Sequence, residues 1–129
     1  MDKQALMQHG VFSWNQLQTI DTSAAKAFYG ELFGWQLSDE QAGETTYTII
    51  KAGDREVGGI TASAPGGNHA PAWGAYVTVD DVDKQVVRAE QLGGKIVVPP
   101  RDIPNVGRFA VINDPQGAIL SLITYTAQG

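Results

Sequence analysis

The chain contains no cysteine in its 129 residues, which excludes disulfides, thiolate nucleophiles and cysteine-based zinc sites. Histidine is also scarce, and only His9 and His69 are present. Neither lies in a segment with strand character or beside a strand-borne acid, so a Ser-His-Asp arrangement lacks its base. Basic residues are few as well: nine Lys and Arg are scattered along a chain of net charge −5. This balance argues against binding of nucleic acid.

Long apolar runs are missing too, because none approaches the roughly 18 residues needed to cross a membrane. The first ten residues do not resemble a signal peptide. The glycine pairs at 58–59, 66–67 and 93–94 lack the spacing of a phosphate-binding loop and are explained by turns and packing. We therefore expect a cytoplasmic protein of one domain, covering residues 1–129, without nucleic-acid or membrane partners.

The stretch from Phe12 to Trp35 carries the clearest structural pattern in the chain. One set of alternate residues, Phe12, Trp14, Gln16 and Gln18, differs from the other, Ser13, Asn15, Leu17 and Thr19, which predicts a strand with two different faces. Asp21 or Ser23 can cap the following helix, and Gly34 can end it in a left-handed conformation. The stripe that faces the core is expected at Ala24, Phe28 and Leu32, widened by Ala25 and Tyr29.

The same pattern returns over residues 73–96, which indicates an internal duplication. The offset from Asp21 to Asp80 is 59 residues, and the offset from Gly34 to Gly93 is the same. We predict two modules at about residues 10–63 and 73–126, joined by a Pro- and Gly-rich linker at 64–72. Each module is expected to be β-α-β-β-β, which makes the fold class α+β.

Details within each module follow from local composition. Residues 38–44 are polar and predict a turn, and Gly53-Asp54 predicts a hairpin. In the second module, residues 95–98 predict a short strand ended by Pro99-Pro100, followed by a loop at 102–106. Asp114-Pro-Gln-Gly117 has the residues of a type I turn between two final strands.

The segments WNQLQT…AKAFYGELFGW, VDDVD…LGGKI and GRFAVINDPQGA within this duplication resemble the vicinal oxygen chelate superfamily. That superfamily includes glyoxalase I, extradiol dioxygenases, and the bleomycin and fosfomycin resistance proteins. The resemblance covers about residues 10 to 126. It implies that the two modules form one cup-shaped mixed sheet, a glyoxalase-like fold, within a homodimer.

Metal-dependent members of the superfamily hold a divalent metal on four inward-facing strand positions. In this chain the resemblance places those positions at Trp14, Gly59, Gly74 and Ser121. None of these residues offers the imidazole or carboxylate that such a metal prefers. Glu56 is the nearest carboxylate, but it lies three residues from Gly59 and so on the opposite face of a strand. We therefore expect no metal and no cofactor.

Strand parity predicts a lining of apolar walls and a few uncharged polar groups for the cup, which suits a small organic ligand. Gly59 and Gly74 would leave open room there. The alternative is that Trp14 and Tyr76 fill the cup as core. Arg108 could bind an anionic group or pair with Asp102 or Asp114. The predicted ligand-binding residues are Trp14, Gln16, Gln18, Gly59, Gly74, Tyr76, Thr78, Arg108, Ser121 and Ile123, with Ile119 on the same strand face as the last two.

The leading functional hypothesis is a metal-free, bleomycin-resistance-like protein that binds a small molecule. One alternative is an enzyme of the superfamily, of the lyase, glyoxalase or dioxygenase type, acting on a small metabolite. The third hypothesis is a regulatory or interaction domain in which side chains fill the cup and leave no room for a ligand. The sequence names no catalytic residue and no ligand.

Overall fold

The computed structural model describes residues 7–42, 45–62, 71–103 and 106–126. Most of the predicted linker, including His69, lies outside the described residues. The contacts divide the chain into two compact units, Trp14–Gly74 and Met1–Ser13 with Ala75–Gly129. We call the first the N-terminal unit and the second the C-terminal unit. None of the described helices is long and apolar enough to span a membrane.

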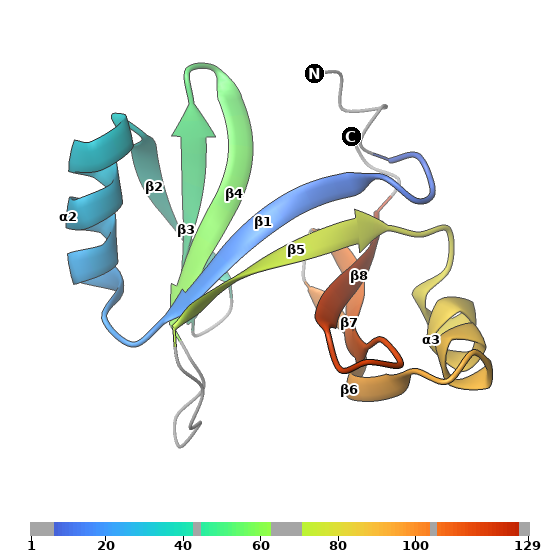
Figure 1. Cartoon of the computed structure of the whole chain (residues 1–129). Coiled ribbons are helices and arrows are strands. Elements are labelled where there is room, and N and C mark those ends of the chain that lie inside the picture. The colour runs from blue at the N-terminus through green and yellow to red at the C-terminus, as the bar shows by residue number, and fades with distance from the viewer. Residues whose placement is uncertain (1–6, 43–44, 63–70, 104–105, 127–129) are drawn as a thin grey trace. The chain divides into compact units, whose positions relative to one another are not determined.

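The N-terminal module has one helix and four strands (Figure 1). Its strands follow the order β2-β3-β4-β1, in which β1 and β4 are parallel and the other neighbours antiparallel. The predicted β-α-β-β-β pattern is therefore confirmed here. The elements are β1 Phe12–Thr19, α2 Thr22–Phe33, β2 Gln36–Ala42, β3 Thr45–Ala52 and β4 Arg55–Ala62.

The C-terminal module repeats this arrangement with the strand order β5-β8-β7-β6. Again the strand before the helix pairs in parallel with the last strand of its module, β5 with β8. The predicted α+β fold of two β-α-β-β-β modules is thus confirmed. Its elements are β5 Ala72–Thr78, α3 Val82–Gln91, β6 Lys95–Ile103, β7 Gly107–Asn113 and β8 Ile119–Tyr125.

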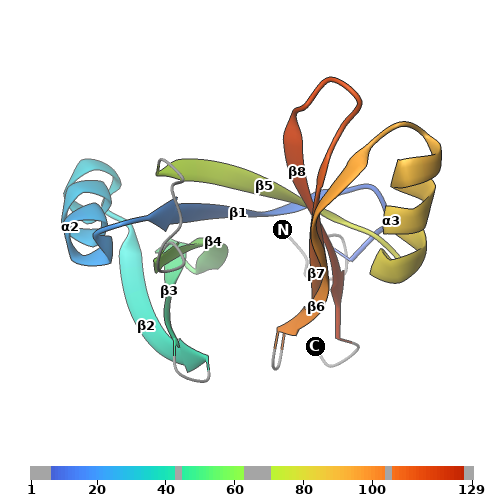
Figure 2. The same cartoon turned by 90° about the horizontal axis from the view of Figure 1, so that it is seen from below.

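Helix α2 begins and ends where the sequence predicts, whereas α3 is capped by Asp81, one residue after Asp80, and by Leu92, directly before Gly93. The side chain of Asp21 accepts a hydrogen bond from the backbone N–H of Ala24 at the start of α2, and Asp81 does the same for Lys84 in α3. Gly34 ends α2 with φ of 70°, a conformation that glycine adopts without steric cost. Figure 2 shows each helix from below.

The face that α2 presents to its sheet agrees with the prediction only in part. Ala25 and Tyr29 pack against the core, whereas Phe28 and Leu32 are 60% and 58% exposed. Ala25 and Tyr29 are spaced i, i+4 along the helix, and so are Phe28 and Leu32. Helical periodicity alone could therefore not show which of the two pairs packs inward. The core itself consists of Leu17, Ile50 and Ile60.

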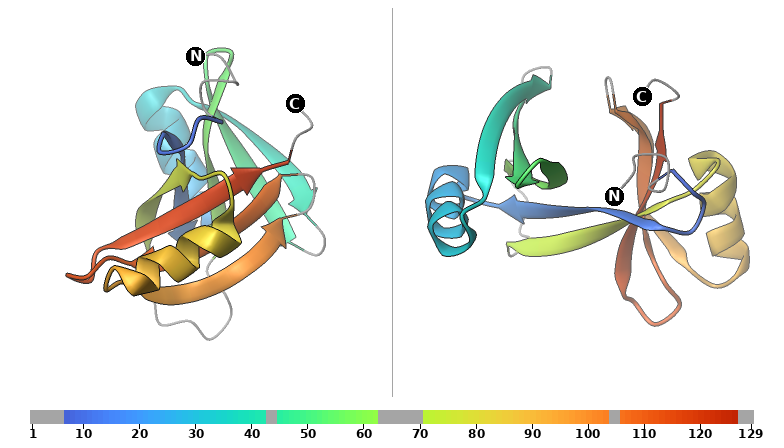
Figure 3. Two further views of the ribbon diagram at one scale, coloured as in Figure 1. Left: turned by 90° about the vertical axis from the view of Figure 1, so that its right-hand side faces the viewer. Right: turned by 90° about the horizontal axis from the view of Figure 1, so that it is seen from above.

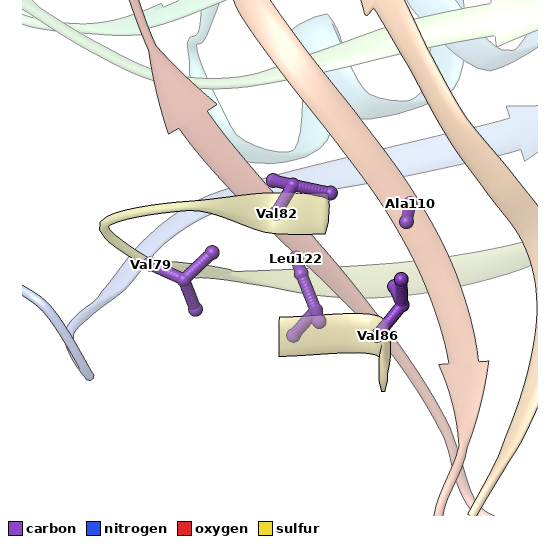
Figure 4. Close-up of a cluster of buried hydrophobic side chains, with 5 residues drawn as sticks. All are labelled: Val79, Val82, Val86, Ala110 and Leu122. Carbon is purple, nitrogen blue, oxygen red and sulfur yellow. The ribbon is translucent and has the colours of Figure 1, made fainter. Parts of the chain in front are cut away.

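In the C-terminal unit, α3 packs along β6, β7 and β8, as the left view of Figure 3 shows. Val82 and Val86, one helical turn apart, are its buried residues. They meet strand residues in a single cluster (Figure 4), completed by Val79, Ala110 and Leu122.

Two expected interruptions are strands. Residues 38–42, predicted as a turn, belong to β2 and pair with β3. Pro99 and Pro100, predicted to end a strand, lie within β6. Both β2 and β6 stand at the ends of the strand order, where one side of the backbone has no strand partner. An edge strand tolerates polar residues and prolines, and β6 also shifts register around the prolines.

Candidate functional site

In the N-terminal unit, the sheet face opposite α2 carries the first group of predicted residues. Leu17 is buried on the helix side, so Trp14 and Gln16 of β1 have the opposite parity. Gln16 pairs with Gly59 of β4 in the parallel register, which places the two side by side. We call this surface the open face of the N-terminal unit.

Tyr47 of β3 joins this group, although it was not among the predicted ligand-binding residues. Its hydroxyl accepts a hydrogen bond from Trp14 Nε1 at 2.9 Å and donates one to Gln16 Oε1 at 2.8 Å. A Cβ atom at Gly59 would overlap the end of the Tyr47 ring. The prediction of open room at Gly59 is therefore wrong, because Tyr47 occupies that space. At Gly74, by contrast, the nearest atom to an added Cβ is the Gln16 backbone oxygen, 3.9 Å away.

The C-terminal unit has a corresponding face opposite α3. Tyr76 pairs with Ser121 and Thr78 with Ile123 in the parallel register of β5 and β8. Burial raises the pKa of Tyr76, and a hydrogen bond with Ser121 partly offsets that rise. Phe109 lies beside it, with 6.5 Å between the two ring centroids. The group is largely buried, and its polar atoms are hydroxyls.

A further pair of hydroxyls lies in the same unit. The Tyr125 hydroxyl and Ser13 Oγ are 2.8 Å apart. Burial is again the main cause that raises the pKa of Tyr125. Both tyrosines are therefore neutral over a wide pH range and can act only as hydrogen-bond donors or acceptors.

The two faces repeat each other in register. In the first module Gln16 pairs with Gly59, and in the second Tyr76 pairs with Ser121. Trp14 and Gly74 each stand two residues before the pairing residue of their strand, and so on the same face. Trp14 of the first module therefore corresponds to Gly74 of the second, and Gly59 corresponds to Ser121. These are the four positions at which the superfamily resemblance places metal ligands, and none of them carries an imidazole or a carboxylate.

Three residues that were predicted to line the cup lie instead in exposed positions or in ion pairs. Gln18 is exposed, and Ile119 is 64% exposed. Arg108 donates from Nε and Nη2 to the carboxylate of Asp83, and from Nη1 to Asp102 at 3.0 Å. The expected rim pairing is confirmed for Asp102. Asp114 instead accepts backbone N–H bonds within its own turn.

This ion pair also affects titration. The hydrogen bond from Arg108 is the largest cause that lowers the pKa of Asp83. The two carboxylates in turn raise the pKa of Arg108. Three of the five N–H donors of Arg108 bond to these two carboxylates, so Arg108 links α3 to the strands β6 and β7.

Two carboxylates of the stretch 38–44, which was predicted as a turn, lie on a strand instead. Asp39 and Glu40 lie in β2. Thr48 and Lys26 bond to Asp39, and the hydrogen bond from Thr48 is the largest cause lowering its pKa. Glu40 pairs directly with Tyr47, so it lies at the edge of the open face. Among the described residues no three of His, Cys, Asp and Glu come together as a metal site.

An apolar pocket of about 470 Å³ lies elsewhere in the N-terminal unit, on the helix side of the sheet. Its walls are aromatic, and Tyr29 and Trp35 stack there with centroids 5.8 Å apart. A ligand site usually adds convergent polar groups to apolar walls, and this pocket offers few. We therefore place the candidate site on the open face of the N-terminal unit. The pocket residues are Asn15, Tyr29, Phe33, Trp35, Ile50, Val57, Gly58 and Trp73.

Comparison with known proteins gives a consistent result. A model of the Glyoxalase/Bleomycin resistance protein/Dioxygenase superfamily matches residues 10–122. The protein named "Putative glyoxylase CFP32" of Mycobacterium tuberculosis is 44% identical over 117 residues, covering 88% of this chain and 44% of that protein. The anthracycline biosynthesis protein DnrV of Streptomyces peucetius is 32% identical over 129 residues, with 88% and 46% covered.

The fold has solved relatives as well. The methylmalonyl-CoA epimerase of Mycobacterium tuberculosis has a TM-score of 0.64 at 17% identity, covering 94% of this chain and 93% of that one. At this identity the likeness concerns the fold alone. The chain spans less than half the length of the curated relatives that it matches.

Proposed function

Because the chain belongs to the glyoxalase/bleomycin resistance protein/dioxygenase superfamily, we propose that it binds a small organic molecule on the open face of its N-terminal unit. The observation that carries this proposal is the bonded group of Trp14, Tyr47 and Gln16. Aromatic surface combined with a few oriented, uncharged polar atoms is typical of small-molecule sites. Tyr76 and Ser121 supply a similar combination in the C-terminal unit.

We further propose that binding needs no metal. Hard and borderline cations require several oxygen or nitrogen ligands that converge on one point. Trp14, Gly59, Gly74 and Ser121 supply none of the expected kind, and Glu40 alone could hold a metal only weakly. Metal analysis of dialysed protein should find far less than one Zn, Ni, Fe or Mn per chain. Stoichiometric metal held by strand residues would refute this part of the proposal.

A thermal-shift screen of chelator-treated protein tests the binding directly. A compound at 100 times its dissociation constant should stabilise the folded protein by about 2.7 kcal/mol. Trp14→Ala should abolish that response, whereas the control Trp73→Ala, which removes a tryptophan from the helix-side pocket, should keep it. If no compound stabilises the parent, or if the response requires added metal, the proposal fails.

An enzymatic role is the second candidate, and Glu40 is the observation in its favour. Glu40 is a carboxylate at the edge of the open face, paired across strands with Tyr47, and it could accept a proton from a bound substrate. A relative at 44% identity is named a glyoxylase, which agrees with such a role. Compounds that bind should then be converted in an NMR time course, and Glu40→Gln should stop conversion without abolishing binding. Conversion that survives Glu40→Gln would exclude this residue as the base.

For assembly we propose a homodimer in the cytoplasm. Phe28, Leu32 and Phe33 are more than half exposed along α2, and contiguous aromatic surface of this kind is enriched in protein interfaces. The matched relatives are about twice as long, which leaves room for a second such domain in their own chains. Light scattering should give twice the chain mass, and Phe28→Asp should halve it. A monomeric parent at high micromolar concentration would contradict the dimer.

A further inference from the structure

The hydrogen bonds of Trp14, Tyr47 and Gln16 run in one direction only. An indole N–H can donate but not accept, so Trp14 must donate to the Tyr47 oxygen, 2.9 Å away. A phenol has a single proton, and Tyr47 therefore donates it to Gln16 Oε1 at 2.8 Å. The amide of Gln16 is thereby fixed with its carbonyl end toward Tyr47. Its NH₂ end carries two donors that Tyr47 does not use.

The glycines beside this chain of hydrogen bonds determine where space remains. At Gly59 any side chain would collide with the Tyr47 ring, so glycine is what allows Tyr47 to reach Gln16. At Gly74 an added Cβ would meet only the Gln16 backbone oxygen, 3.9 Å away. Gly74 therefore leaves room for an added Cβ atom next to the Gln16 backbone. Trp14 provides a half-buried aromatic surface on the same strand face.

From this geometry we infer that the Gln16 Nε2 group donates a hydrogen bond to a neutral carbonyl oxygen of the bound ligand. The inference rests on the proposed binding function and specifies its ligand class. Two N–H donors select for an acceptor, and Trp14 favours a ligand with an aromatic or other flat apolar part. A neutral carbonyl fits better than a carboxylate, because none of the three bonded side chains carries a positive charge. Tyr47 is a positioning residue, which acts by holding the amide.

The direction of the hydrogen bonds can be tested without a ligand. Each of the three tryptophans gives its own indole N–H signal in a ¹H–¹⁵N NMR spectrum. Tyr47→Phe should move the Trp14 indole signal and the side-chain NH₂ signals of Gln16, and leave the Trp73 indole in place. The matched control is Tyr29→Phe, because the Tyr29 hydroxyl accepts from Trp73 Nε1 at 3.2 Å. That variant should move the Trp73 signal instead. If Tyr47→Phe leaves the Trp14 signal unmoved, the inference is overturned.

Ligand selectivity is tested with acetophenone and ethylbenzene, which share a shape but differ in the carbonyl oxygen. Acetophenone should move the Gln16 NH₂ signals, whereas ethylbenzene should not. Gln16→Leu should weaken acetophenone binding about two- to tenfold, the effect of one neutral hydrogen bond, and leave ethylbenzene binding unchanged. Equal binding of the two probes, or no Gln16 response up to the solubility of acetophenone, would overturn the inference.

The same titrations separate this inference from the proposed function. If a compound from the screen binds on the open face but the Gln16 signals stay in place, the carbonyl inference fails and the binding function stands. If no compound of any class binds, both fail together.

Discussion

Replacing Gly59 with alanine tests the packing of the open face most sharply. The new Cβ would collide with the end of the Tyr47 ring, and the ring is the part that can move. Moving it costs the hydrogen bonds to Trp14 and Gln16. At about 0.5–1.5 kcal/mol for each bond, we expect Gly59→Ala to lower the free energy of unfolding by about 1–3 kcal/mol.

A double-mutant cycle assigns this cost to its cause. In a Tyr47→Ala background the collision and both bonds are already absent, so adding Gly59→Ala should cost almost nothing. Gly74→Ala is the matched control, because the space there is free; it should be neutral or stabilise by up to about 1 kcal/mol. Urea unfolding followed by tryptophan fluorescence gives the free energy of unfolding of the parent and of each variant. A harmless Gly59→Ala, or an equal cost in both backgrounds, would refute the reasoning.

Three further outcomes follow from burial and charge. Arg108→Gln should destabilise at neutral pH but not in acid: Asp83 has a lowered folded-state pKa, so its contribution is present above the ordinary value of about 4 and is lost as pH falls. Parallel stability curves for parent and variant would contradict this. Burial raises the pKa of Tyr76, so stability should fall as pH rises beyond about 10, and Tyr76→Phe should fall less steeply in the same assay. Val82→Ala should cost about 1.5–3 kcal/mol in urea unfolding, whereas Val87→Ala, more than half exposed, should change stability by less than about 0.5 kcal/mol.

The local pattern of the sequence predicts most of the fold. Alternation over residues 12–19 specifies β1, and the caps at Asp21 and Gly34 bound α2 where the structure has it. The duplication inferred from the sequence appears again as equivalent register in the parallel strand pairs, because Tyr76 and Ser121 correspond to Gln16 and Gly59 at offsets of 60 and 62 residues. These features depend on neighbours in sequence, so sequence alone is sufficient to find them.

The errors concern edges and faces. Whether residues 38–42 form a turn or an edge strand depends on β3, which supplies their hydrogen bonds. Likewise, α2 has two apolar stripes, and the one that packs inward is the one that shares the core with Trp35 and Leu37. Each of these choices is made by tertiary contacts, and local propensity cannot anticipate them.

The site was predicted in part for the same reason. Parity placed Trp14 and Gln16 on one face, and the structure joins them through Tyr47. Tyr47 was missed because a tyrosine in a β-rich run indicates only a strand. A usable signal was present: Gly59 in the middle of a strand indicates close approach by another group. That group proved to be a protein side chain, which fills the room expected for a ligand.

A crystal structure of metal-stripped protein with a compound from the screen tests the central claim most directly. The account predicts that the compound lies against Trp14 with an acceptor oxygen at Gln16 Nε2, and that no metal bridges it to the protein. A compound held through a metal ion, or seated only in the aromatic pocket beside Trp35 and Trp73, would contradict it.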